Sequence, residues 1–230
     1  MFGLDYILAS HLMLASTTPT VKCIMKTAPQ ITVSAVGLDR GIDHTKSVRD
    51  LNAFKPQTSP SPYGMGADTY IQGLAKGGVS VQGQYQFSGH EYPSLSQGCL
   101  FVDKVNITIT LDSTIFIARE YKEGTCFYKA VLEHERKHRA VDRALVNKYS
   151  NIIVKAVNNT MKTIGYAQGP FESSQKEAIQ ARIANVVGSI LSQYGDNFSV
   201  ERERMQTNVD TLTEYDRVHA LCKDWPQPKL

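Results

Sequence analysis

The stretch from Cys126 to Thr163 constrains the fold more than any other part of the sequence, because it contains neither proline nor glycine. Apolar residues recur along it at helical spacing and mark one face: Phe127, Val131, Val141, Leu145, Tyr149, Ile152 and Ala156. Gly165, Gly169 and Pro170 then interrupt the pattern. The pattern predicts one long helix that turns this face toward the protein core.

A second helical pattern follows the interruption and runs from about Glu172 to Tyr194. Its apolar positions again recur at helical spacing: Ile179, Ile183, Val186, Val187, Ile190 and Leu191. Two long helices joined by a short break usually pack against each other in opposite directions. We therefore expect an antiparallel helical hairpin, followed by a further helical or mixed segment over 200–222.

The first half of the chain has the period of strands rather than helices. Alternating apolar residues or β-branched residues predict strands over four segments: 31–36, 79–87, 105–111 and 113–119. Only a short turn separates the last two, which predicts a hairpin. A short helix is expected over 46–53, and a Pro/Ser/Gly-rich loop over 54–68. The fold class predicted is α+β, with an antiparallel sheet before the long helix and the helical hairpin.

The 230 residues fit a single domain, and a composition of 42% hydrophobic and 20% charged residues is ordinary for a globular protein. We expect this domain over 21–222, β-rich over 21–120 and helical over 126–222. Residues 1–20 would be an N-terminal arm or a remnant export segment, and 223–230 a tail.

Charge and hydropathy argue against nucleic acid as a partner and against insertion in a membrane. A net charge of +3 is too small to indicate nucleic-acid binding, and no nucleic-acid module is recognisable. No apolar run approaches the ~20 residues that span a bilayer, so we expect no integral membrane segment. The first twenty residues are moderately apolar, but they lack a basic start and carry Asp5 and His11.

The four cysteines are Cys23, Cys99, Cys126 and Cys222, and none of them forms a C-x-x-C pair. Their even number and wide spacing favour two disulfides and an oxidising compartment, periplasmic or secreted. The alternative is four buried thiols in a cytosolic protein. Of the three possible pairings we predict Cys99–Cys126, which would fasten the long helix to the sheet, together with Cys23–Cys222.

The long helix carries the motif H-E-x-x-H, as His134-Glu135-Arg136-Lys137-His138. Histidines one turn apart lie on one helix face and can bind one metal ion. Both continue the apolar face described above, so they point toward the protein. The glutamate lies about 100° round the helix, beside the metal rather than on it, where it can take a proton from water. Alternatively, the two histidines are core residues satisfied by hydrogen bonds.

This motif resembles that of the zincin metallopeptidases. With the β-rich segment before it, "VLEHERKHRAVD" is similar to the predicted secreted zinc-dependent proteases of bacteria, over about residues 100–150. The resemblance implies a zinc ion (Zn²⁺) held by His134 and His138, Glu135 as general base, and a peptide or protein substrate. The chain departs from the zincin pattern in its charged Arg136 and Lys137, and it lacks the longer H-E-x-x-H-x-x-G-x-x-H form.

Asp142 follows His138 by one helical turn and leans back toward it. We expect its carboxylate to accept a hydrogen bond from the His138 imidazole, outside the ligands themselves. The alternative for Asp142 is a surface ion pair with Arg139.

A catalytic zinc ion usually has three protein ligands, and the motif supplies only two. If the two helices pack antiparallel about a turn near residue 167 or 168, His134 lies opposite position 201. We therefore predict Glu201 as the third ligand. A break at Gly195 would shift the register and favour Glu203, Asp210 or His219. Alternatively, Glu201 and Glu203 are solvated partners of neighbouring arginines.

Together these patterns predict a zinc-dependent hydrolase, most simply a peptidase that acts by metal-assisted hydrolysis with Glu135 as base. A hydrogen-bond donor for the developing oxyanion is expected from a Tyr, His or Arg within 196–219. Two alternatives belong to other classes. One is a non-catalytic, disulfide-stabilised secreted module with a degenerate metal site, and the other is a helical interaction protein.

Overall fold

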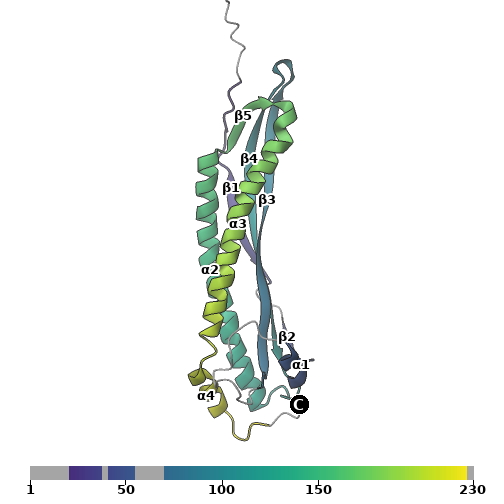
Figure 1. Ribbon diagram of the computed structural model, residues 1–230, viewed down its shortest axis with the longest axis vertical. Helices are drawn as coiled ribbons and strands as arrows, with labels where there is room; N and C mark the ends of the chain where they lie inside the picture. The colour runs from purple at the N-terminus through teal and green to yellow at the C-terminus, as the bar shows by residue number, and fades with distance from the viewer. Residues whose placement is uncertain (1–20, 38–40, 55–69, 227–230) are drawn as a thin grey trace, which may run out of the picture.

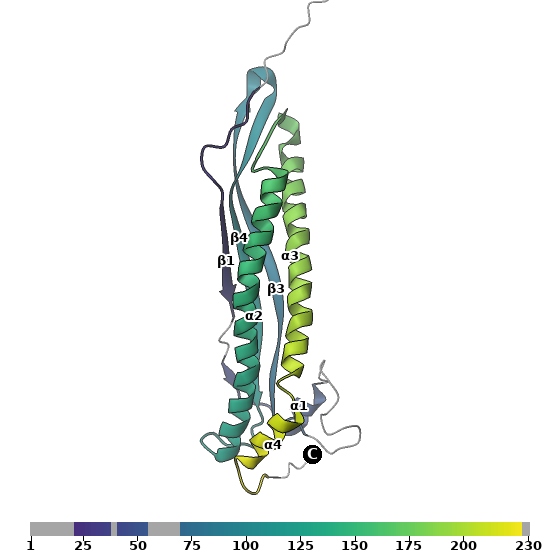
Figure 2. The same ribbon diagram turned by 90° about the vertical axis from the view of Figure 1, so that its left-hand side faces the viewer.

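The computed structural model describes residues 21–37, 41–54 and 70–226. The expected N-terminal arm and nearly all of the expected loop at 54–68 lie outside these residues, as does the end of the tail. The molecule is elongated, with two long helices lying side by side along one face of a long-stranded sheet (Figures 1 and 2). Across the described ranges, no helix has both the length and the apolar character needed to cross a membrane.

The sheet is organised around one central strand, β4 (Gln97–Ile117). Strands β1 (Gln30–Val36) and β2 (Ile42–Asp43) run parallel to it. Strands β3 (Gly73–Tyr92) and β5 (Ala167–Glu172) pair with it in the antiparallel direction. The prediction of an antiparallel sheet is therefore wrong, because β1, β4 and β2 are parallel. Alternation of apolar residues has the same period of two in both kinds of pairing, so it carries no information on strand direction.

The hairpin expected between 105–111 and 113–119 is also wrong, because β4 runs straight through Asp112 and Ser113. Ser113 is fully buried and pairs with Gly77 on β3. A side chain at Gly77 would sit only 1.5 Å from the Asp112 carbonyl oxygen, so the strands approach closely here. The actual hairpin joins β3 to β4 through a short 3-10 turn over Pro93–Leu95.

The predicted helices are present. Helix α1 spans Val48–Ala53, and α2 spans Cys126–Ile164, as the stretch without proline and glycine predicts. Helix α3 spans Lys176–Thr207 and continues through Gly195. It runs back alongside α2 in the opposite direction (Figure 1). A shorter helix, α4, spans Leu212–Ala220 at the end where α2 begins.

The main core lies between the sheet and the two long helices. Every second residue of β4 from Val105 to Ile109 is buried in it, and the helices contribute residues such as Leu145, Ile153 and Phe198. Burial of this apolar face fixes the rotation of α2 about its own axis. Side chains that continue this face near the start of α2, such as His134 and His138, must therefore also point inward.

Two disulfides are present, but with another pairing than predicted. They join Cys23 to Cys99 and Cys126 to Cys222. The second bond links the first residue of α2 to the chain just after α4, because α4 packs beside the start of α2. The first ties the segment before β1 to β4. Disulfides of this kind are typical of proteins outside the cytoplasm.

Candidate metal centre

Helix α2 places the three motif residues inside the protein. His134, Glu135 and His138 are only 6%, 3% and 8% exposed. The charged neighbours Glu133 and Arg136 lie on the exposed side of the helix. This division follows from the apolar face of α2, which the histidines extend toward the helix start. Buried imidazoles and carboxylates need polar or ionic partners, so the surroundings of these residues decide their role.

The two histidines meet a carboxylate from a distant part of the chain. The Nε2 atoms of His134 and His138 are 3.2 Å apart. The Oδ1 atom of Asp210 lies 3.2 Å from the first and 3.1 Å from the second. These three residues could together hold a metal ion. Ligand atoms bound tetrahedrally to zinc lie roughly 3.3 Å apart, so the spacing of this triangle is compatible with such an ion, as it is with hydrogen bonds among the three groups.

Each histidine uses its other ring nitrogen for a partner outside the triangle. The Nδ1 atom of His134 lies 3.3 Å from Oε1 of Glu214, and Nδ1 of His138 contacts Oε1 of Gln206. An acceptor at Nδ1 keeps the proton there and leaves the lone pair on Nε2. Both Nε2 lone pairs can then be directed at one point. This is the usual arrangement around histidines that bind metals.

Charges in the cluster are strongly coupled. Burial alone would lower the pKa of His138, but Asp210 and Glu135 outweigh it and raise the pKa to about 9. The pKa of His134 is raised against the same effect of burial, chiefly by its hydrogen bond with Asp210. Burial would raise the pKa of Asp210, yet hydrogen bonds with both histidines hold it well below its usual range. Without metal, these shifts favour protonated histidines on either side of an ionised Asp210 carboxylate, and a metal ion would have to displace the Nε2 protons.

Glu135 lies on the sheet side of the cluster, against β3. It accepts a hydrogen bond from the backbone of Ala75, and a side chain placed on Gly73 would collide with it. Its Oε2 atom is buried and has no hydrogen-bond partner among the described residues. Burial raises the pKa of this carboxyl above its ordinary value. The Glu135 carboxyl interacts electrostatically with His134, His138 and Asp210, and its unpartnered oxygen can accept a hydrogen bond.

Asp142 is close to His138 but does not bond to it directly. Its buried carboxylate accepts hydrogen bonds from Arg202, at 2.6 and 3.1 Å, and from the Gln206 amide, at 2.7 Å. The expected bond from the His138 imidazole is thus replaced by a contact through Gln206. The ion-pair partner of Asp142 in this network is Arg202.

The prediction of Glu201 as third ligand needs correction. Its carboxylate accepts hydrogen bonds from Lys148 and Tyr149, and Asp210, one of the alternatives considered above, completes the triangle. Strand β5 and a further short turn lie between the long helices and lengthen their connection. His138 therefore faces Gln206.

Glu214 and Gln206 contact the histidines but were not predicted, whereas Tyr215 lies in the segment 196–219, from which a hydrogen-bond donor was expected. One sequence signal for this region existed. Thr211 and Glu214 form the T-x-x-E pattern that begins many helices, and Thr211 does cap α4. That pattern places a turn between α3 and α4, and Asp210 lies in this turn. His219, another alternative ligand, instead packs its ring against Trp225.

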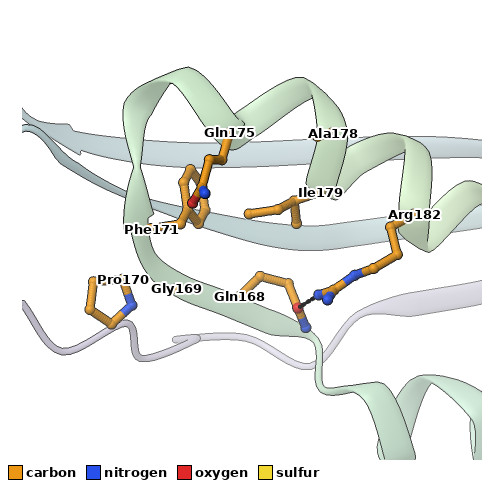
Figure 3. A pocket seen from close by; sticks show the side chains of 8 residues that line it. All are labelled: Gln168, Gly169, Pro170, Phe171, Gln175, Ala178, Ile179 and Arg182. Atoms are coloured by element: carbon orange, nitrogen blue, oxygen red, sulfur yellow. Dashed lines mark hydrogen bonds between the residues drawn. The ribbon is translucent and has the colours of Figure 1, made fainter.

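A separate cavity of about 430 Å³ lies at the other end of the molecule, between β5 and the start of α3 (Figures 1 and 3). It is lined by Gln168, Gly169, Pro170, Phe171, Gln175, Ala178, Ile179 and Arg182. Arg182 is the one ionisable residue in this lining, and its guanidinium donates to the Gln168 side chain at 2.7 Å. The lining therefore lacks the acids, bases and nucleophiles of a catalytic site.

No protein-family model, curated protein or solved structure matches this chain. Functional inference therefore rests on the geometry of the His134, His138 and Asp210 cluster and its surroundings.

Proposed function

We propose that this protein is a zinc-dependent hydrolase whose metal ligands are His134, His138 and Asp210. The observation that carries the proposal is the triangle of their ligand atoms, with sides of 3.1 to 3.2 Å. The acceptors behind both Nδ1 atoms support it, since they direct the Nε2 lone pairs inward.

Glu135 is the proposed general base. Zinc bound by the triangle would acidify a water molecule and polarise a substrate carbonyl group. Glu135 would accept the proton from that water on its unpartnered oxygen. Its raised pKa suits this role, because a base works best when its pKa approaches the working pH.

Tyr215 is the proposed donor to the developing oxyanion. Its hydroxyl donates to Asp210 Oδ1 at 3.2 Å, and its ring packs 5.3 Å from that of His134. A phenol at this position could transfer its hydrogen bond to a substrate oxygen as negative charge develops there. It lies within the segment in which such a donor was expected.

A peptide or protein is the proposed substrate, on the resemblance of the motif to the zincins and to the predicted secreted zinc-dependent proteases of bacteria. We also propose a periplasmic or secreted location. The two disulfides support this, because the cytosol keeps most thiols reduced.

Metal content tests the proposal most directly. Protein purified without added metal should carry about one zinc ion per chain by inductively coupled plasma analysis. The His134→Ala/His138→Ala variant should lose the ion, and Asp210→Asn should bind it at least 100-fold more weakly, beyond the range for residues outside the ligands. Glu201→Gln is the matched control, and it should retain wild-type affinity because Glu201 pairs with Lys148 instead.

The same experiment can reject the proposal. Zinc-free wild-type protein with no measurable affinity would mean that His138, Asp210 and His134 form a buried ionic cluster of structural importance only. If zinc binds, Glu135→Gln should keep the ion and lose peptide hydrolysis by a factor of roughly 10² or more. Retained hydrolysis in that variant would remove Glu135 from its assigned role.

A further inference from the structure

Gln206 is a neutral residue that contacts the outward-facing ring nitrogen of His138, a ligand of the proposed metal centre. It is buried, and its amide makes three contacts. Its Nε2 atom donates to the His138 carbonyl oxygen at 3.1 Å and to Asp142 Oδ1 at 2.7 Å, while its Oε1 atom contacts Nδ1 of His138. In His134, by contrast, the Nδ1 atom contacts a charged group, the carboxylate of Glu214.

The orientation of the Gln206 amide follows from the charge of Asp142. Arg202 binds both oxygens of that carboxylate through its Nε and Nη2 atoms. An ionised carboxylate can only accept hydrogen bonds, so the group that Gln206 turns toward it must be the NH₂ group. The amide oxygen must then face His138.

The orientation of the amide in turn determines the proton position on His138. An amide oxygen can only accept, so Nδ1 of His138 must carry the proton. In the metal-free protein Nε2 donates its own proton to Asp210, and it is Nε2 that can lose this proton and turn a lone pair to the proposed ion. If the amide were reversed, its NH₂ group would favour the opposite tautomer, in which Nε2 carries a proton and cannot bind metal.

We propose that Gln206 is a positioning residue that fixes which nitrogen of His138 faces the metal, and that the Asp142–Arg202 ion pair fixes the orientation of Gln206. This inference rests on the proposed metal centre. Arg202 also donates to the Gly77 carbonyl oxygen at 3.2 Å, so the network joins α2, α3 and β3. The side chain of His138 is thereby held by two long helices and the sheet.

Two single variants and one double variant test this positioning role through zinc affinity, measured with a competing chelator. Gln206→Leu removes the acceptor at nearly constant volume and should weaken zinc binding 10- to 100-fold. Asp142→Asn removes the fixed acceptor for the amide and should also weaken it. The double variant Asp142→Asn/Gln206→Glu moves the negative charge from residue 142 to residue 206. The new carboxylate can accept the hydrogen bond from Nδ1 of His138. The combined variant should recover most of the lost affinity.

Tyr149→Phe is the matched control. It removes another buried contact between α2 and α3, the hydrogen bond from Tyr149 to Glu201, without touching a proposed ligand. It should lower thermal stability but leave zinc affinity unchanged. If Gln206→Leu lowers only stability, as the control does, or if the combined variant binds zinc no better than Asp142→Asn alone, the positioning role is overturned.

A second measurement does not depend on metal. In the metal-free protein, ¹H–¹⁵N NMR should show a slowly exchanging Nδ1 proton on His138 that disappears in Gln206→Leu. Absence of this proton from the wild type would overturn the inference even if zinc binds. Its presence in a protein that binds no zinc would reject the proposed metal centre and leave only the orientation of His138 by Gln206.

Discussion

At the level of single residues, two buried tyrosine hydroxyls have opposite environments. Tyr121 is 2% exposed, and its hydroxyl has no hydrogen-bond partner among the described residues. Tyr149 is similarly buried but donates to Glu201 at 3.0 Å. A buried hydroxyl without a partner costs stability, whereas a bonded one contributes to it. The same substitution should therefore have opposite effects at these two positions.

Tyr121→Phe should raise the free energy of unfolding by roughly 1 kcal/mol, because it removes an unsatisfied donor. Tyr149→Phe should lower the free energy of unfolding by about 1 kcal/mol, because it removes a bonded one. Urea denaturation of both variants against the wild type measures the difference. A loss of stability in Tyr121→Phe as large as that in Tyr149→Phe would show that Tyr121 has a partner.

Alkaline titration gives an independent test of the Tyr121 environment. Burial raises the pKa of Tyr121 from 10.0 to about 12, with a further contribution from Glu120. Since the folded pKa lies above the ordinary value, ionisation favours the unfolded state. The stability that the protonated Tyr121 hydroxyl gives relative to its ionised form is complete below pH 10 and is lost as the pH rises toward 12. Unfolding midpoints measured between pH 8 and 11 should fall less steeply in Tyr121→Phe than in the wild type, and equal slopes would contradict this.

At the level of elements, the position of Glu135 depends on how closely β3 approaches α2. A Cβ atom on Gly73 would lie 2.4 Å from Val131 Cγ1 and 2.7 Å from Glu135 Oε1. Gly78, on the same strand, has nothing within 4 Å of the equivalent point. These two glycines therefore separate the effect of a closer contact from the effect of a lost glycine.

Gly73→Ala should lower the free energy of unfolding by about 1–3 kcal/mol, the usual cost of overpacking, and should displace the Glu135 carboxylate. Gly78→Ala should be nearly neutral. Thermal unfolding compares the two, and peptide hydrolysis reports the displacement if Glu135 is the base. Equal stability of the two variants would mean that α2 and β3 can separate at no cost.

The sequence predicted those parts of the site that a local pattern determines. His134, Glu135 and His138 lie inside because they continue the apolar face of a helix, and this face is visible in the order of residues alone. Asp210 is 72 positions from His138, and its approach depends on the length of the connection that contains β5. Strand direction and cysteine pairing failed for the same reason, since both depend on contacts between distant segments. The charge of Asp142 was recognised near His138, but the intervening Gln206 was not.

At the level of the whole molecule, one disulfide holds the end of the protein that carries the proposed metal centre. The Cys126–Cys222 bond joins the start of α2, which carries both histidines, to the chain after α4. Asp210 lies in the turn between α3 and α4, and Glu214 and Tyr215 lie within α4, so all three precede that bond in the chain. The Cys23–Cys99 bond lies at the other end of the sheet, beside β5.

The two bonds should therefore differ in their effect on metal binding. Cys126→Ser/Cys222→Ser should weaken zinc binding at least 10-fold, because Asp210 and Glu214 lose their fixed position relative to α2. Cys23→Ser/Cys99→Ser should lower stability by roughly 2–5 kcal/mol, as loss of a native disulfide commonly does, with little change in affinity of the folded protein. Chelator titration and thermal unfolding measure the two effects, and equal affinity losses would contradict the assignment.

The distant origin of Asp210 has a consequence for the order in which the protein matures. The two histidines are available as soon as α2 forms, but the carboxylate arrives only after α3 has folded back along α2 and the chain has turned into α4. A chain in which α3 and α4 have not packed beside α2 would thus present only two imidazoles, a weak and unselective site for metal. If the proposed metal centre exists, tight zinc binding would need the fold that brings Asp210 to α2, which the Cys126–Cys222 bond, with its sequence separation of 96, helps to hold. On the proposed function, hydrolytic activity would therefore appear only in the completely folded chain.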